Sequence, residues 1–204
     1  SKPKAKLWIK YAGNWAQKNP PVGYAFQRWY LKKNFLKCKV TVNGRWPDQA
    51  DHVLSFENPC LTEQERIEGE QAIAIKNYSL ALDFVFVGQL NKSKGVDRIL
   101  EAFQQLKNEP RIGLLHLIGD GTERGRYEKN AAEAGINCRF YGFLPKEEVN
   151  YVLASSHVLL LPSESEGFPK VIAEGSNYGC IPIASDISCL SQYVKDDMNG
   201  FIMP

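Results

Sequence analysis

The chain has 204 residues, of which 44% are hydrophobic and 24% charged, and this length suits one domain or one domain with part of another. The formal net charge of +2 gives no indication of a nucleic-acid partner, and no apolar run approaches the ~20 residues that a membrane span needs. The five cysteines form no C-x-x-C pair, which predicts reduced thiols in a cytosolic protein and excludes a zinc site of that type.

The first 60 residues contain few strands. Apolar alternation and turn residues predict strands over 7–11, 39–44 and 52–56, and a helix over 22–36. Three short strands are too few to bury a core alone. We therefore interpret residues 1–60 as the tail of a larger N-terminal domain, followed over 61–79 by a polar, Glu-rich linker or short helix.

The predicted helix over 22–36 is aromatic and basic. It carries Phe26, Trp29, Tyr30 and Phe35 among Arg28, Lys32, Lys33 and Lys37. Such a helix can lie on an anionic membrane surface or hold a lipid-linked acceptor. The alternative, which we expect, is that its aromatic side chains pack into the parent domain and its lysines are solvated.

From residue 80 onward, apolar runs and amphipathic runs alternate through short turns. Strands are expected over 82–87, 112–118, 138–143, 157–161, 181–184 and 201–203, and helices over 96–106, 123–134, 147–154, 170–178 and 190–194. This alternation predicts an α/β domain over 80–204, a Rossmann-like parallel sheet with helices on both faces. Ligands of such sheets bind beyond the carboxyl ends of the strands.

The stretch from Pro162 to Gly175 follows one of these strands and opens a helix at Pro169. The free N–H groups of a helix start bind phosphate. The two carboxylates of the stretch, Glu166 and Glu174, would repel phosphate but can accept hydrogen bonds from vicinal hydroxyls. A ligand that has phosphates between two diols, each diol bound by one carboxylate, is a nucleoside diphosphate sugar.

Glu166 and Glu174 are separated by seven residues and enclose Gly167-Phe168-Pro169, with Pro-Ser before them and Gly-Cys-Ile-Pro-Ile-Ala-Ser-Asp after them. This pattern resembles the E-x7-E signature of retaining glycosyltransferases of family 4. The resemblance covers about the last two thirds of the chain. It implies a GT-B fold, in which 80–204 is the C-terminal nucleotide-sugar-binding half and 1–60 the end of the first domain.

The loop from Gly88 to Gly95 is similar to the family's G-R-L-x-x-x-K-G loop, whose Arg and Lys hold the diphosphate. Lys94 matches the Lys, whereas Gln89 stands in place of the Arg and is uncharged. The resemblance implies that Lys94 stabilises the leaving diphosphate and that Glu166 positions the donor sugar. These two are the predicted catalytic residues.

The resemblance also implies which residues bind the donor. Glu174 would bind the ribose hydroxyls, Arg139 and Phe140 the base, and the remaining contacts would come from Gly88, Gln89, Gly119, Gly121, Gly167, Phe168, Pro169, Lys170 and Val171. A plain turn remains the alternative for Gly119 and Gly121. Their G-x-G-x-x-x-G spacing does not match the dinucleotide fingerprint, so we expect no nicotinamide cofactor. No Asp-x-Asp motif is present, and we expect no metal.

The resulting hypothesis is a glycosyltransferase that moves a sugar from a nucleoside diphosphate sugar to a glycan or lipid-linked acceptor, in surface polysaccharide or glycoconjugate synthesis. We favour a UDP-sugar over a GDP-sugar as the donor. We expect a cytoplasmic protein with peripheral contact to the inner face of the membrane and no nucleic-acid partner. Because both ends look cut, we expect the fragment itself to be inactive. The alternatives are a binding module without turnover and an epimerase or phosphorylase of the same fold.

Overall fold

The computed structural model describes residues 6–203. Contacts divide the chain into two compact units. The first unit contains the residues up to Pro59 together with Ser165–Phe168 and Ile187–Tyr193. The second contains Cys60–Glu164, Pro169–Asp186 and the residues from Val194 onward. The predicted linker over 61–79 lies within the second unit.

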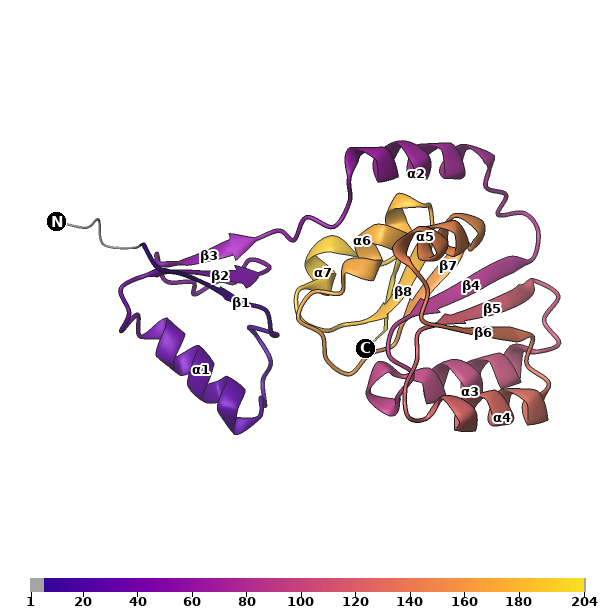
Figure 1. The fold of residues 1–204 in the computed structure, drawn as a ribbon, viewed down its shortest axis with the longest axis horizontal. Helices are drawn as coiled ribbons and strands as arrows, with labels where there is room; N and C mark the ends of the chain where they lie inside the picture. The colour runs from indigo at the N-terminus through magenta and orange to yellow at the C-terminus, as the bar shows by residue number, and fades with distance from the viewer. Residues whose placement is uncertain (1–5, 204) are drawn as a thin grey trace. The chain divides into compact units, whose positions relative to one another are not determined.

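The first unit is a three-stranded parallel sheet with one long helix. The strand order is β1 (Trp8–Tyr11), β2 (Lys39–Asn43), β3 (Val53–Phe56), and α1 (Val22–Lys32) connects β1 to β2 (Figure 1). The short helix α7 (Leu190–Tyr193) belongs to the same unit. A small core forms from Tyr11, Trp15, Cys38, Val40, Val42 and Val53.

The second unit is a six-stranded parallel sheet, as the sequence predicts, with the order β6-β5-β4-β7-β8-β9. Its strands are β4 (Leu82–Val87), β5 (Ile112–Ile118), β6 (Cys138–Gly142), β7 (Val158–Leu161), β8 (Ile181–Ser185) and β9 (Phe201–Met203). Its helices are α2 (Glu63–Ile75), the 3-10 turn η1 (Lys92–Lys94), α3 (Val96–Leu106), α4 (Arg124–Ala134), α5 (Lys146–Ser155) and α6 (Lys170–Asn177). Within residues 6–203, no helix combines the length and apolarity needed to cross a bilayer.

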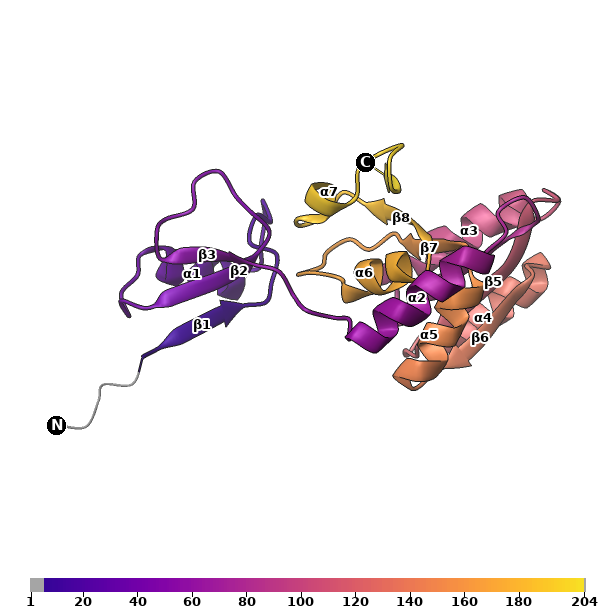
Figure 2. The ribbon, with the colours of Figure 1, turned by 90° about the horizontal axis from the view of Figure 1, so that it is seen from above.

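The helices of the second unit form layers on the two faces of its sheet (Figure 1). One face is covered by α3 and α4, and the other by α5 and α6, which α2 overlies (Figures 1 and 2). Side chains alternate along β4, so Phe84 and Phe86 enter the core beneath α3 and α4 together with Phe103. All strands are parallel, and the helix N-termini after β4, β5, β6 and β7 therefore share one edge of the sheet.

Helix α2 begins with a capping box. The Thr62 hydroxyl accepts a hydrogen bond from the Glu65 N–H at 3.2 Å, and the Glu65 carboxylate accepts one from the Thr62 N–H at 2.7 Å. Asn177 at the end of α6 donates to the Glu65 carbonyl at 2.8 Å. The Glu-rich segment is thus a docked helix and not an extended connection.

Lys76, directly after α2, links the C-terminal ends of α5 and α6 through hydrogen bonds. Its ammonium group donates to the carbonyl oxygens of Leu153, Ser156 and Tyr178. These carbonyls lie where α5 and α6 end, and helix ends leave carbonyl groups without intrahelical donors. Burial lowers the pKa of the Lys76 ammonium from its ordinary value.

The predicted boundaries lie within one residue of the observed ones except at the end of α1, and two of the differences have a local cause. The helix expected over 22–36 ends at Lys32, because Asn34 adopts a left-handed conformation with φ 54°. The strand expected over 138–143 ends at Gly142, whose φ of 74° favours glycine.

Candidate functional site

The loop after β4 is fixed by its own turn chemistry. The Asn91 side chain accepts hydrogen bonds from the Lys94 N–H at 3.0 Å and from the Ser93 hydroxyl at 2.9 Å. Gly95 has φ 78°, and a Cβ there would lie 2.3 Å from the Pro162 carbonyl oxygen. The loop therefore brings the half-buried Lys94 close to the end of β7, in a conformation that only glycine at position 95 permits.

Gly119 and Gly121, in the loop after β5, lie against the loop after β4. A Cβ on Gly119 would lie 2.0 Å from the Gly88 carbonyl oxygen, and one on Gly121 would lie 2.3 Å from that of Leu90. The Leu90 N–H donates to Asp120 at 2.9 Å, and the Gly119 N–H donates to Gly142 at 2.8 Å. The predicted glycines after β4 and β5 are thus brought together, and the packing of three loops explains why these residues are glycine.

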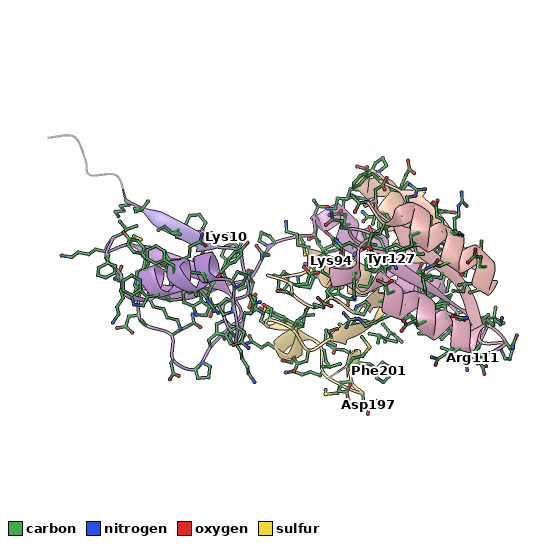
Figure 3. The ribbon with its side chains drawn as sticks, turned by 90° about the horizontal axis from the view of Figure 1, so that it is seen from below. Lys10, Lys94, Arg111, Tyr127, Asp197 and Phe201 are labelled. Carbon is green, nitrogen blue, oxygen red and sulfur yellow. The ribbon has the colours of Figure 1, made fainter. Side chains whose placement is uncertain are left out.

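A polar network from α4 and α3 supports the turn that carries Lys94 (Figure 3, where Lys94 and Tyr127 are labelled). The Glu123 carboxylate accepts from the Lys92 N–H at 3.0 Å. The buried Tyr127 hydroxyl donates to Asp97 at 2.9 Å, and burial followed by the bond to Asp97 raises the pKa of Tyr127. Arg126 pairs with both Asp97 and Glu123, at 3.0 and 2.8 Å.

The segment predicted to receive a base lies on β6, at the edge of the sheet. Phe140 packs against the core, while the exposed Arg139 lies on the other face with its guanidinium 4.7 Å from the Tyr141 ring centre. The Tyr141 hydroxyl hydrogen-bonds the His116 Nδ1 at 2.7 Å. Neither predicted residue is at the carboxyl end of the strand. The apolar side chain there is that of Phe143, which is 83% exposed and was not among the predicted residues.

The start of α6 is built as the sequence predicts. Pro169 is its N-cap residue and is buried, and Lys170 and Val171 follow as the first helical residues. Their N–H groups have no carbonyl partner inside the helix, as at every α-helix start. Gly175 packs so closely on β7 that a Cβ would lie 2.8 Å from the Leu159 side chain.

Glu174 lies on the first turns of α6 and is half-buried. Burial raises the pKa of the Glu174 carboxyl, and the neighbouring cations Lys146 and Lys170 act in the opposite direction. No hydrogen bond or ion pair reaches the Glu174 carboxylate from any side chain or backbone group within residues 6–203. This carboxylate is therefore partly desolvated and keeps its acceptor oxygens available to a ligand.

The cations beside Glu174 are themselves ordered. Lys146, the first residue of α5, pairs with Glu65 of α2 at 2.6 Å and donates to the Cys60 carbonyl at 3.3 Å. Hydrogen bonds from Lys146 and then Thr62 lower the pKa of the buried Glu65 to about 2. Sequence reasoning did not find Glu65 or Lys146, although the Thr62-x-x-Glu65 capping signal was present in the sequence.

Glu166, Gly167 and Phe168 group with the first unit. The Gly167 carbonyl accepts a hydrogen bond from the Ser188 hydroxyl at 2.7 Å, and a Cβ on Gly167 would lie 1.9 Å from the Ala12 carbonyl oxygen. The Phe168 ring meets the Tyr193 ring edge-on, with 5.5 Å between centres. Glu166 is half-buried in this loop.

Comparison with known proteins identifies the family. The family described as "Glycosyl transferases group 1" matches residues 74–204, more than half of the chain. The chain belongs to the glycosyl transferases group 1 family.

Two curated relatives that match within this range are named as glycosyltransferases. The chain is 34% identical over 124 residues to the lipopolysaccharide 1,6-galactosyltransferase of Salmonella typhimurium, which covers 57% of this chain and 34% of that protein. It is 37% identical over 83 residues to the 2-deoxystreptamine glucosyltransferase of Streptomyces kanamyceticus, covering 40% of this chain and 21% of that one. The chain thus spans about a third or less of the length of these two relatives.

Two solved structures share the fold, one of them a galactosyltransferase by its description. Anabaena HepE in complex with UDP and glucose superposes with a TM-score of 0.72 at 16% identity, covering 97% of this chain and 57% of that one. The lipopolysaccharide outer core galactosyltransferase WaaB, in its apo form, gives 0.53 at 29% identity, covering 63% and 37%. The predicted α/β fold of GT-B glycosyltransferases is confirmed.

Several of the predicted donor-binding residues lie in the second unit, along the loops at the carboxyl ends of β4 and β5. These are Gly88, Gln89, Lys94, Gly119 and Gly121. Pro169, Lys170, Val171 and Glu174 lie on the start of α6, after the neighbouring strand β7. Gln89 is exposed and accepts a hydrogen bond from the Asn91 amide at 2.9 Å. No cluster of three or more His, Cys, Asp or Glu suited to a metal occurs within residues 6–203.

Proposed function

We propose that this chain is the nucleotide-sugar-binding part of a retaining glycosyltransferase of family 4. The full enzyme transfers a sugar from a nucleoside diphosphate sugar to a glycan or lipid-linked acceptor in lipopolysaccharide or other surface polysaccharide synthesis. The relatives named for lipopolysaccharide galactosyl transfer and O-antigen mannosyl transfer support this class of product. The solved neighbours in complex with UDP support a UDP-sugar as donor.

One observation carries the proposal. Glu174 is a half-buried carboxylate on the second turn of helix α6, unpaired within residues 6–203, and two lysines near it favour its ionised form. An ionised carboxylate that keeps both oxygens available suits the two hydroxyls of a ribose. The helix start beside it favours the phosphates.

The chemistry requires stabilisation of the leaving group. The bond between the anomeric carbon and the β-phosphate oxygen breaks, and the diphosphate leaves with the electron pair. An acceptor hydroxyl oxygen forms the new bond to the anomeric carbon on the same face, and its proton passes to the departing phosphate oxygen. Lys94 and the N–H groups at the start of α6 stabilise the charge that develops on it. Glu166 orients the donor sugar, and the backbone after β6, at the exposed Phe143, receives the base in place of Arg139 and Phe140, which lie within the strand. Gln89 contributes hydrogen bonds to the diphosphate but no charge.

The decisive experiment is a titration of the chain with UDP, GDP and ADP by calorimetry. We expect measurable UDP affinity that falls by about tenfold or more in Glu174→Ala, since hydrogen bonds to a charged group contribute ~1.5–3 kcal/mol. Lys92→Ala, an exposed lysine on the same side of the fold, serves as the control and is expected to keep its affinity. Equal affinities in the two variants would contradict the ribose assignment.

Product analysis with a labelled donor and the full enzyme tests the reaction itself. Transfer with retention at the anomeric carbon supports the proposal. Release of free sugar alone, a changed sugar on the same nucleotide, or a sugar phosphate would assign the protein to hydrolysis, epimerisation or phosphorolysis.

A further inference from the structure

The loop after β4 contains a side-chain amide whose orientation follows from its partners. The Asn91 side chain accepts a hydrogen bond from the Lys94 backbone N–H at 3.0 Å. A backbone N–H can only donate, so the Asn91 atom that faces it is the amide oxygen Oδ1. The Ser93 hydroxyl donates to the same oxygen at 2.9 Å. The other end of the Asn91 amide is therefore its NH2 group, which has two hydrogens to donate.

This assignment extends to Gln89. The NH2 group of Asn91 lies 2.9 Å from one end of the Gln89 amide. Because an amide NH2 group only donates, that end of Gln89 is its carbonyl oxygen Oε1. The Gln89 NH2 group takes no part in this pair, and it donates to no protein group within residues 6–203. Since the Gln89 side chain is exposed, both hydrogens of its NH2 group are available to a ligand.

The backbone on both sides of Asn91 is held in place. Leu90, the residue before it, is fully buried, and its N–H donates to the Asp120 carbonyl at 2.9 Å. Lys92, the residue after it, donates its backbone N–H to the Glu123 carboxylate at 3.0 Å. Asn91 is thus anchored through its neighbours, and its side chain can orient the exposed amide of Gln89.

We propose that Asn91 is a positioning residue for the diphosphate of the donor. Its oxygen caps the turn that ends at Lys94 (Figure 3), and its NH2 group holds the carbonyl of Gln89. Gln89 therefore presents N–H donors, and not its carbonyl, to the phosphates. One side chain orients both the charged and the uncharged phosphate ligand. This inference rests on the proposed function, because it assumes that these loops bind a nucleoside diphosphate.

An uncharged ligand depends on its orientation more than a charged one does. The two ends of a glutamine amide have nearly the same shape, so a half-turn replaces an attractive N–H with a repulsive carbonyl. An arginine offers five donors and no acceptor, and it has no orientation that repels a phosphate. Since position 89 holds glutamine, binding of the diphosphate requires a neighbour that fixes the direction of the amide.

The test is a double-mutant cycle between positions 89 and 91, measured as UDP affinity by calorimetry. Asn91→Asp keeps the oxygen that caps the turn but replaces the NH2 group with an acceptor, so Gln89 reverses and turns its carbonyl toward the phosphates. We expect UDP affinity to fall by about tenfold or more, with the melting temperature nearly unchanged. In a Gln89→Arg background, the same Asn91→Asp change is expected to leave affinity equal or higher, because the new carboxylate orients the guanidinium.

Lys92→Ala is the charge-matched control. It lowers the net charge of the loop by one, as Asn91→Asp does, and we expect it to keep the wild-type affinity. If Asn91→Asp acts only through charge, it lowers affinity by the same factor in both backgrounds. If Asn91 serves only to cap the turn, Asn91→Asp changes affinity in neither. Either result overturns the proposal.

The Gln89 amide also provides a direct signal by nuclear magnetic resonance. We expect the resonances of its NH2 group to shift when UDP saturates the wild type, and to shift much less in Asn91→Asp at saturation. Failure of the proposed function is distinguishable: a wild type that does not bind UDP overturns both proposals, as does a Glu174→Ala variant of unchanged affinity. UDP binding that requires Glu174 but is unaffected by Asn91→Asp overturns only the role of Asn91.

Discussion

The ammonium group of Lys146 lies 2.6 Å from the carboxylate of Glu65, and this pair joins the start of α5 to the first turn of α2. Glu65 is 8% exposed, whereas the Lys146 side chain is 50% exposed and neighbours Glu174. The buried Glu65 thus holds the exposed Lys146 beside Glu174, the proposed ribose-binding carboxylate. The pair connects the stability of the second unit with the properties of its binding site.

The first prediction concerns acid stability. In the folded chain the pKa of Glu65 is lowered to about 2. Between the ordinary pKa of a glutamate and about pH 2, the unfolded chain therefore carries a proton on Glu65 that the folded chain lacks. Stability from this group is therefore present above about pH 4.5 and is lost as the pH falls toward 2. We expect Glu65→Gln to show a shallower fall of unfolding free energy over this range, measured by urea titration with circular dichroism. Parallel curves for both proteins would show that the ion pair contributes nothing.

The second prediction concerns the pH dependence of nucleotide binding. Burial raises the pKa of Glu174, so binding by its ionised form is lost as the pH falls through that raised value. Lys146 and Lys170 lower this pKa and Glu65 raises it, while Cys60 lies close by with its own pKa raised by burial and Glu174.

Lys146→Met removes one of these cations, and the pKa of Glu174 therefore rises further. We expect UDP affinity in this variant to decline at a higher pH than in the wild type, with affinity about threefold to tenfold lower where the two profiles differ most. Calorimetric titrations from about pH 5 to 8 measure this shift. Lys129→Met, an exposed lysine of α4, is the control, and coinciding profiles for wild type and Lys146→Met would refute the coupling.

The third prediction concerns two glycines of the same region. Gly119→Ala places a Cβ 2.0 Å from the Gly88 carbonyl oxygen at φ 126°, and we expect a loss of about 2–4 kcal/mol in unfolding free energy. Gly125→Ala is the matched control, because it lies in α4 with no atom within 4 Å of the added Cβ. We expect that change to stabilise by about 0.5–1 kcal/mol. Thermal or urea unfolding distinguishes the two, and a similar effect of both changes would contradict the loop packing.

The fourth prediction concerns Lys76. Lys76→Met leaves the carbonyls of Leu153, Ser156 and Tyr178 without this donor, and we expect a destabilisation of about 1–3 kcal/mol. Hydrogen exchange should show the loss at the ends of α5 and α6, with little change in α3 and α4 on the opposite face. Uniform loss of protection, or no loss, would exclude a specific role for the ammonium group.

The sequence predicted most elements of the second unit because their periodicity is strong and their ends carry signals. Helix α6 was expected over 170–178 and spans Lys170–Asn177, since Pro169 and Gly179 mark its limits. Helix α2 was harder to predict because its apolar residues do not favour one face, and only the Thr62 and Glu65 capping signal marks its start. The end of α1 carries no glycine, and Asn34 supplies the left-handed residue instead.

The candidate site was predictable where it depends on one loop at a time. The positions of Gly88, Lys94, Gly119 and Glu174 follow from the turn after a strand or the start of a helix. The pairing of Lys146 with Glu65 depends on how α2 packs across α5, and residues 81 positions apart leave no local pattern. Likewise, alternation along β6 places Phe140 and Arg139 on opposite faces, which the resemblance alone did not reveal.

The absence of acidic residues before Asp48 has a practical consequence for handling the protein. The remaining residues carry fourteen basic and twenty-three acidic side chains, so a part of charge +11 is followed by one of charge −9. The sequence pI of about 8.2 is therefore a poor guide to chromatography, and at neutral pH the chain should adsorb to both cation- and anion-exchange resins. Solutions should turn cloudy when salt is dialysed away and clear again when it is restored, as head-to-tail attraction between chains is screened.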